Sequence, residues 1–344
     1  MFRHSHTRGS APRIRNALWG ALAIGLVAGA LNFLLYPISH GADFAQFHYH
    51  ARVWLSGRDP YSGGFPIMRA TRVIPEPLFY PFPTLLAVAP FALIPLRFGG
   101  AAFIALSTAF LAFGLIRSSP ERLPMLLGAG CFVAVGLGQW SLLVTAAILL
   151  PAMAWLMVLK PNIGVAATIA LPSIIGAAGG AVLLLGTLAL QPSWPHEWIR
   201  NLHSMPPHPA PISTTGGIII LAALLRWRRP EARLLFAMAC VPQLMYFSDQ
   251  LPLWLVPATR RESTLLTVSS LIGWLTSLEL ASRAGTQPAF NSTWIVLAST
   301  YVPALIMVLR RPNQGNVANS IEHRLGFLPE WLAGSNETDQ ELPS

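Results

Sequence analysis

Asp43 is the residue whose type and position best fit a chemical role in this sequence. It follows the first long apolar run, at about 17–36, by only a few residues. A carboxylate where a membrane helix meets water is costly to keep near hydrocarbon, so such a residue is a functional candidate. Within hydrogen-bond reach of an attacking hydroxyl, Asp43 would serve as general base. The alternative is a helix N-cap, since aspartate is favoured there and a helix is expected to begin at this point.

Two residues of the same polar segment are further candidates. Arg58 would contact an anionic head group, an interpretation that stands beside that of an ordinary surface arginine. Asp59 precedes Pro60, so turn formation explains Asp59 at least as well as substrate binding does.

Two more polar residues lie within strongly apolar surroundings, Gln139 and Lys160. Lys160 either extends its ammonium to the membrane interface or neutralises a phosphate as a point charge, which we favour. Gln139 would hydrogen-bond either a substrate hydroxyl or a neighbouring helix.

The composition identifies the kind of chain that must position these residues. Of 344 residues, 53% are hydrophobic and only 11% are charged, whereas soluble domains carry about 25% charged residues. Many apolar runs approach the roughly 20 residues that span a bilayer. We therefore predict an all-α polytopic transmembrane protein in the cell membrane, with the lipid bilayer as its surroundings.

The net charge of +9 does not indicate a nucleic-acid partner. The arginines stand at the ends of apolar runs, as topology signals do, and they form no basic stripe with interleaved aromatics. We expect no nucleic acid to bind.

The arginine pattern predicts the topology. Basic residues precede the first apolar run, which places residues 1–16 in the cytoplasm as a tail and makes that run a signal anchor. The transmembrane domain is expected at 17–311, with extracytoplasmic loops at about 37–77 and 191–210. Residues 312–344 are polar and are expected to be a flexible cytoplasmic tail.

About ten or eleven helices are expected in the transmembrane domain. The predicted spans are 17–36, 78–96, 99–116, 123–137, 141–158, a helix pair in 163–190, 211–225, 232–247, 264–281 and 292–309, with 251–258 as a re-entrant segment or short helix.

One helix is predicted within the first loop, at 43–57. Its aromatic apolar face, which includes Phe44, Phe47 and Trp54, suits a helix lying at the membrane interface. Gly57 and Pro60 are expected to end it.

No metal or cofactor is expected. His48 and His50 are two residues apart on the predicted helix, so their side chains do not face the same way. No HExxH or CxxC pattern, glycine-rich phosphate loop or GxSxG sequence is present.

Several short motifs resemble a known family. They are Asp43 after the first span, Trp54-Leu55-Ser56-Gly57-Arg58-Asp59-Pro60-Tyr61, Tyr80-Pro81-Phe82-Pro83, Gly138-Gln139 and Lys160-Pro161. The chain resembles the GT-C class of polytopic glycosyltransferases, and most closely the bacterial glycosyltransferase family 87. Two positions depart from the family pattern: Ser141 stands where asparagine is common, and Phe82 displaces the second proline to Pro83.

The resemblance implies a function. The donor would be a polyprenyl-phosphate-linked hexose, often mannose in the family, and the acceptor a glycan or glycolipid on the extracytoplasmic side. Asp43 would be the catalytic base of an inverting displacement with the lipid phosphate as leaving group. The substrate contacts would be Arg58, Asp59, Tyr61, Tyr80, Gln139 and Lys160.

Two other classes of protein also fit the composition. A transporter or flippase of lipid-linked substrates would have many helices with few intramembrane charges, although internal symmetry would be expected. A non-catalytic subunit of an envelope-assembly complex is the third possibility, and it would tolerate the loss of Asp43.

Overall fold

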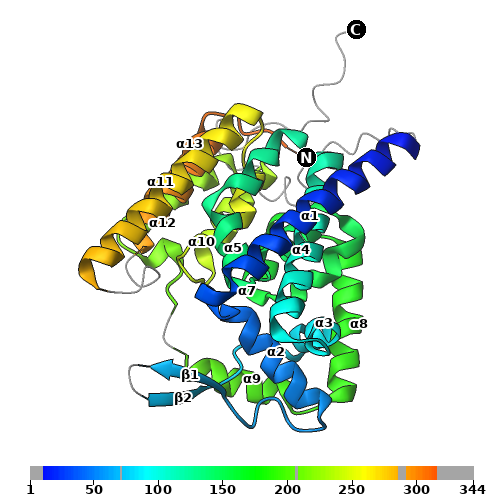
Figure 1. Ribbon diagram of the computed structural model, residues 1–344. Coiled ribbons are helices and arrows are strands. Elements are labelled where there is room, and N and C mark those ends of the chain that lie inside the picture. Colours follow the sequence, from blue (N-terminus) through cyan, green and yellow to red (C-terminus); the bar gives the residue numbers. More distant parts are fainter. Residues whose placement is uncertain (1–10, 70–71, 206–207, 286–291, 316–344) are drawn as a thin grey trace.

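The computed structural model describes residues 11–69, 72–205, 208–285 and 292–315 and is mostly helical (Figure 1). The α-helices are α1 Ala11–Ser39, α2 Ala42–Leu55, α3 Phe82–Ala92, α4 Leu96–Ser118, α5 Ala129–Leu137, α6 Ser141–Leu149, α7 Pro161–Ala170, α8 Ile174–Leu190, α9 Trp194–His203, α10 Pro230–Cys240, α11 Arg260–Ala284, α12 Thr293–Val296 and α13 Val302–Leu309. The 3-10 segments are Pro120–Leu127, Pro151–Leu159, Pro211–Ser213, Gly217–Arg226 and Leu251–Leu255, and a π-turn, Leu297–Tyr301, joins α12 to α13.

Several helices are compatible with a membrane protein. Three in the described ranges are long and apolar enough to cross a bilayer: Pro12–Ser39, Leu96–Ser118 and Arg260–Ala284. Two bent pairs raise the number to five if each pair is one span: Pro120–Leu127 with Ala129–Leu137, bent by 57°, and Ile174–Leu190 with Trp194–Ser204, bent by 97°.

The larger predicted number of helices as full spans stays a prediction. The apolar runs expected at 78–96 and 211–225 form only the short helices Phe82–Ala92 and Gly217–Arg226. The run expected at 232–247 is helical only to Cys240, where α10 ends and a loop begins. The pair expected within 163–190 is present as α7 and α8.

Glycines allow α1 and α4 to pack closely. A Cβ on Gly25 would lie 2.4 Å from the Ala105 carbonyl oxygen, and one on Gly29 would lie 2.7 Å from the Ala101 carbonyl oxygen. Small residues at this spacing let two apolar helices approach backbone to backbone, which is a common solution in membranes. The contact fixes the end of α1, and therefore the start of α2.

The aromatic face of α2 is buried in the protein core. Phe44 and Phe47 are fully buried; the Phe44 ring stacks on Phe103 with centroids 5.3 Å apart, and the Phe47 ring lies 5.8 Å from that of Trp140. The predicted position of this face at the membrane interface is therefore wrong, because α3 and α4 cover it. This burial makes α2 a rigid support for Asp43.

A small antiparallel hairpin is the exception to the all-α prediction. Strands β1 Phe65–Arg69 and β2 Arg72–Glu76 pair with Phe65 opposite Glu76. The hairpin lies beside α2 and α9 at one end of the molecule (Figure 1).

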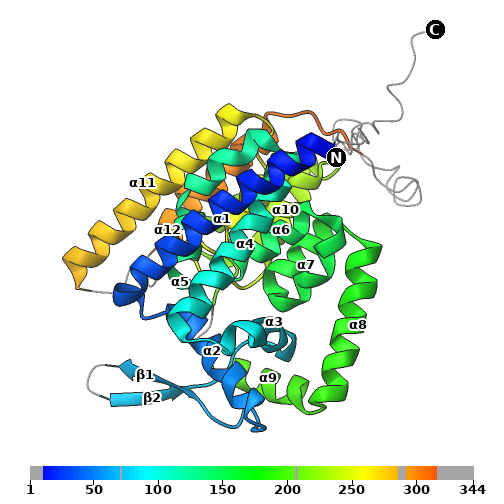
Figure 2. The same cartoon turned by 45° about the vertical axis from the view of Figure 1, so that its right-hand side comes forward.

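The two predicted loops lie together at that end. The Trp198 indole N–H of α9 donates to the Phe79 carbonyl oxygen over 2.9 Å, and the Asn201 amide donates to the Leu78 carbonyl oxygen over 3.2 Å. Helix α9 therefore lies beside α2 and α3, as Figure 2 shows. Which side of a membrane this end faces stays a prediction.

Parts of the predicted tails lie outside the described residues, namely 1–10 and 316–344. Residues 11–16 of the expected N-terminal tail already belong to α1.

Candidate functional site

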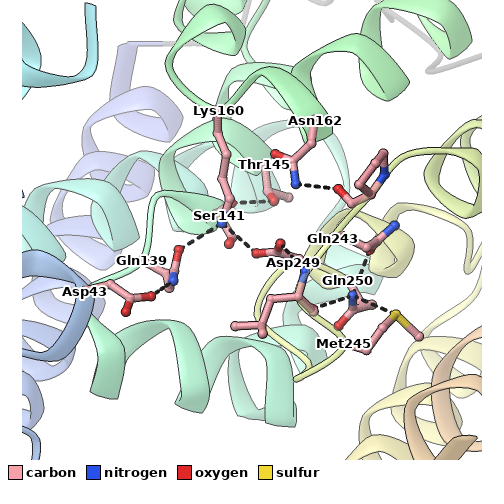
Figure 3. Close-up of polar contacts among 12 residues, drawn as sticks. Asp43, Gln139, Ser141, Thr145, Lys160, Asn162, Gln243, Met245, Asp249 and Gln250 are labelled. Atoms are coloured by element: carbon pink, nitrogen blue, oxygen red, sulfur yellow. Dashed lines mark hydrogen bonds and ion pairs between the residues drawn. The ribbon is translucent and has the colours of Figure 1, made fainter. Parts of the chain in front are cut away.

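Four polar side chains from distant parts of the chain form one connected network (Figure 3). The Lys160 ammonium donates to the Asp249 carboxylate over 2.5 Å and to the Gln139 carbonyl oxygen over 2.8 Å. The Gln139 amide N–H in turn donates to the Asp43 carboxylate. The order of contacts is therefore Asp43, Gln139, Lys160, Asp249, with the one cation between two carboxylates.

Asp43 stands in the first turn of α2 but is not its cap. The N-cap is Gly41, with φ of +82°, and no side chain caps the helix. The capping alternative is therefore wrong for this carboxylate, which accepts from Gln139. Asp43 is partly exposed, whereas its helical neighbours Phe44 to His48 are buried.

Gly138 brings Gln139 to Asp43. It follows the end of α5 in a left-handed conformation, with φ of +69°, which glycine adopts without penalty. A Cβ at this position would lie 2.5 Å from the Phe44 Cβ. The absence of that atom lets the turn between α5 and α6 lie against the first turn of α2.

Lys160 points inward. Only 4% of the residue is exposed, and it immediately precedes α7, which begins at Pro161. The preceding carbonyl, that of Leu159, accepts from the Thr84 hydroxyl of α3 over 2.9 Å. The structure therefore does not show the alternative in which Lys160 extends to the interface, and its interaction with phosphate stays a prediction.

Asp249 was not anticipated from the sequence. It lies in the loop 241–250 and is only 3% exposed. Its second carboxylate oxygen accepts from the Leu244 backbone N–H over 3.1 Å. The signal in the sequence was a carboxylate between two apolar runs, 232–247 and 251–258, where a charge is costly and needs a reason.

Tyr80 is the fourth predicted site residue at this centre. Its hydroxyl interacts with the Gln139 side chain, and it faces the carboxylates of Asp43 and Asp249. Burial raises the pKa of the Tyr80 phenol well above its usual value, and the two carboxylates add to this effect. The phenol therefore stays protonated and available as a donor. Its ring packs edge-on against that of Phe47, with the ring centroids 4.4 Å apart.

The electrostatic surroundings make Asp43 a suitable base near neutral pH. The pKa of Asp43 is raised to about 6. Burial is the main cause; the Lys160 ammonium opposes it, the Asp249 and Glu76 carboxylates add to it, and the Gln139 hydrogen bond also lowers the pKa. A base is most effective when its pKa lies near the working pH.

The remaining predicted site residues follow the other end of α2, which ends at Leu55. Arg58 is exposed, and its Nε donates to the Ser56 hydroxyl over 3.1 Å. The Asp59 carboxylate accepts from the Tyr61 backbone N–H over 2.9 Å, which fits the turn interpretation. Tyr61 is buried and donates its hydroxyl to the Tyr80 carbonyl oxygen over 2.9 Å. Tyr61 thus supports Tyr80, and contact of all three residues with substrate stays a prediction.

The structure also has an apolar groove of about 510 Å³, within the range of small-molecule pockets. Its lining comes from α1, α5, the loop 241–250 and α11: Leu31, Leu35, Ile38, Ser39, Phe132, Val133, Val135, Gly136, Leu137, Tyr246 and Trp274. Ser39 lies four residues before Asp43, Leu137 two before Gln139, and Tyr246 three before Asp249. The segments that carry Asp43, Gln139 and Asp249 therefore also contribute residues to the groove, whereas the segment of Lys160 does not.

Within the described ranges, no three or more His, Cys, Asp or Glu side chains gather as a metal site would require. Comparisons of the chain with models of protein families, with curated proteins and with solved structures found no match.

Proposed function

We propose that this chain is a membrane hexosyltransferase with a GT-C-like fold, which moves a sugar from a polyprenyl-phosphate donor to an extracytoplasmic glycan or glycolipid. The observation that carries the proposal is the hydrogen-bonded chain from the partly exposed Asp43 carboxylate through Gln139 to the buried Lys160 ammonium, close in sequence to residues that line an apolar groove. A lipid-linked substrate needs this combination of polar and apolar surfaces.

The proposed reaction is a single displacement. The acceptor hydroxyl oxygen forms a bond to the anomeric carbon, and the bond from that carbon to the lipid phosphate breaks, with the electron pair leaving on the phosphate. The proton of the hydroxyl passes to Asp43. The pKa of about 6 supports this role, since Asp43 is then largely ionised at neutral pH and still basic enough to accept the proton.

Lys160 is the proposed partner of the phosphate. An ammonium has three N–H donors. In the part of the chain that the structure describes, Gln139 and Asp249 accept two of these donors. The third remains for a phosphate oxygen, and the positive charge offsets the charge that develops on the leaving group.

The groove is the proposed place of the isoprenoid chain. It is lined almost entirely by apolar side chains, and one lining residue, Ser39, precedes Asp43 by four positions. Burying a lipid tail here would hold the donor with its phosphate toward the network.

The proposed orientation has the N-terminus in the cytoplasm and the network on the extracytoplasmic side. The arginines before the first span support it. So does the position of both predicted extracytoplasmic segments at the end that carries α2 and α9.

The test is transfer from radiolabelled polyprenyl-phosphate sugars in membranes that express the chain. The wild type is compared with Asp43→Asn at matched expression, with mannose first and other hexoses after it. We expect transfer by the wild type and a loss of about 10²- to 10⁴-fold in the variant. Equal transfer by both proteins would remove Asp43 as base; no transfer from any of the hexose donors would overturn the reaction class.

A second candidate, a flippase of lipid-linked substrates, has one observation in its favour. The Lys160–Asp249 ion pair is buried beside a carboxylate whose pKa lies near neutral, as in proton-coupled carriers. Reconstituted vesicles separate the two candidates. A flippase would move a fluorescent polyprenyl-phosphate lipid between leaflets without an acceptor, whereas a transferase would require the acceptor and consume the donor.

A further inference from the structure

Asp249 has no part in the proposed displacement, yet it is the most firmly held member of the network. Its two carboxylate oxygens have separate partners: one accepts from the Lys160 ammonium over 2.5 Å and the other from the Leu244 backbone N–H over 3.1 Å. The side chain is 4% exposed. A carboxylate buried this deeply is costly unless its partners are fixed in place.

The loop that carries Asp249 is tied down along its length. The Gln250 amide donates to the Gln243 carbonyl oxygen over 2.7 Å, and the Tyr301 hydroxyl donates to the same oxygen over 3.0 Å. The Ser292 hydroxyl donates to the Met245 carbonyl oxygen over 2.6 Å. Asp249 is therefore placed by hydrogen bonds within its loop and from Ser292 and Tyr301, independently of Lys160.

The network has a direction set by donor and acceptor types. Lysine is only a donor, so the Gln139 atom that faces Lys160 must be the carbonyl oxygen. The Gln139 amide nitrogen then necessarily faces Asp43, where it donates to the carboxylate.

We propose that Asp249 is a positioning residue: it holds the Lys160 ammonium on the far side of Gln139 from Asp43, and so sets the charge that Asp43 experiences. The contacts among these residues do not depend on the proposed function. Only the role of Asp43 as a base rests on it. Asp249 acts through Lys160 and Gln139 and does not touch the substrate.

The proposal predicts how the proton affinity of Asp43 responds. The groups that face Asp43 are Lys160, Asp249, Glu76, Tyr80 and Gln139. In Asp249→Asn a negative charge is lost, and Lys160 is left with Asp43 as its remaining carboxylate in the network. Both effects favour the ionised form of Asp43, so its titration midpoint moves to lower pH.

The experiment measures protonation of Asp43 without any donor substrate. Dicyclohexylcarbodiimide modifies protonated carboxyl groups, and mass spectrometry of the purified full chain in detergent reports the extent at Asp43 as a function of pH. The wild type should show half-maximal modification near pH 6. Asp249→Asn should shift this midpoint to lower pH, and Asp249→Glu, which keeps the charge, should restore it.

The matched control is Ser248→Ala. Ser248 is fully buried in the same loop, and no hydrogen-bond partner of its hydroxyl oxygen is found in the described structure. Its loss should leave the midpoint where the wild type has it. An equal shift in Ser248→Ala would overturn the proposal, because loop packing alone would then explain the effect.

A second variant keeps the test decisive if Asp249→Asn does not fold. Gln139→Leu removes the link between Lys160 and Asp43, and loss of that hydrogen bond should move the midpoint to higher pH. An unchanged midpoint in either folded variant would overturn the proposal. Because labelling needs no sugar donor, a failed transfer assay would remove the proposed function and leave this result standing.

Discussion

Two regions of the molecule use buried cations in different ways. Around the partly buried Arg226 and Arg311, guanidinium groups donate mainly to backbone carbonyls, and Arg311 also pairs with the Glu262 carboxylate over 2.5 Å. Arg226 donates to the carbonyl oxygens of Leu309 and Arg311, over 3.2 and 2.6 Å, and Arg311 donates to that of Val256 over 2.9 Å. At the network, Lys160 donates only to side chains, those of Gln139 and Asp249.

The difference favours a distinction between residues that support the fold and the proposed functional centre. Carbonyls at the end of a helix lack intrahelical partners, so an arginine that satisfies them stabilises the fold directly. Asp249 and Lys160 satisfy mainly each other, and a buried pair of this kind is often no more stable than well-packed apolar residues. We infer that the arginine region is retained for stability and the network for chemistry.

The largest expected effect comes from removing only the cation of the network. Lys160→Met leaves the Asp249 carboxylate buried without its counter-charge, which should cost about 3–5 kcal/mol of stability and abolish transfer. Thermal unfolding in detergent, followed by tryptophan fluorescence, measures the first effect. Stability unchanged from the wild type would show that the pair does not form as described.

A smaller effect is expected from Gly138→Ala. The left-handed backbone costs a residue with a Cβ about 1–2 kcal/mol, and the new atom would lie against Phe44. The turn must shift to relieve both the backbone strain and the contact with Phe44, so Gln139 should move away from Asp43. Transfer should therefore fall by more than the loss of folded protein explains. Gly216→Ala is a suitable control, since its backbone is also left-handed, with φ of +80°, and nothing lies within 4 Å of the added atom. Equal behaviour of the two variants would contradict the role of Gly138.

The third prediction concerns pH. Because Asp43 must be ionised to act as base, transfer should fall about tenfold per pH unit below its pKa of about 6. Stability should change in the opposite direction. The folded pKa lies above the ordinary value of 3.8, so the contribution of Asp43 is fully present below pH 3.8 and is lost as pH rises through 6. Unfolding midpoints of the wild type and Asp43→Asn between pH 4 and 8 measure this difference; a constant difference would contradict it.

The smallest effect is expected from Arg226→Gln. The loss of its hydrogen bonds to the end of α13 should lower stability by about 1 kcal/mol and leave the transfer rate per folded molecule unchanged. Transfer and unfolding are measured on the same preparation. A fall in specific activity would show that Arg226 contributes to transfer as well as to stability, which would contradict the distinction between the two regions.

Part of this organisation could be predicted from the sequence. Apolar runs located α1, α4 and α11, and the cost of polar groups in such runs indicated Asp43, Gln139 and Lys160. Hydropathy could not show that the 232–247 run is helical only to Cys240, since its remaining residues are apolar in the loop as well. Asp249 was therefore missed, because its importance comes from a contact with a residue 89 positions away.

The burial of the α2 face was missed for a related reason. An aromatic stripe at helical spacing suits a membrane interface and a protein core equally well. The packing of Phe44 against Phe103 decides between them, and this contact is made across the fold.

The central claim is tested most directly by measuring both stability and transfer in the double variant Lys160→Met/Asp249→Leu. This double variant replaces both charges with apolar side chains and leaves neither unpaired. The account predicts stability equal to or up to about 4 kcal/mol above that of the wild type, together with loss of transfer. A marked fall in stability would make the pair part of the structural framework, and retained transfer would show that the chemistry does not need it.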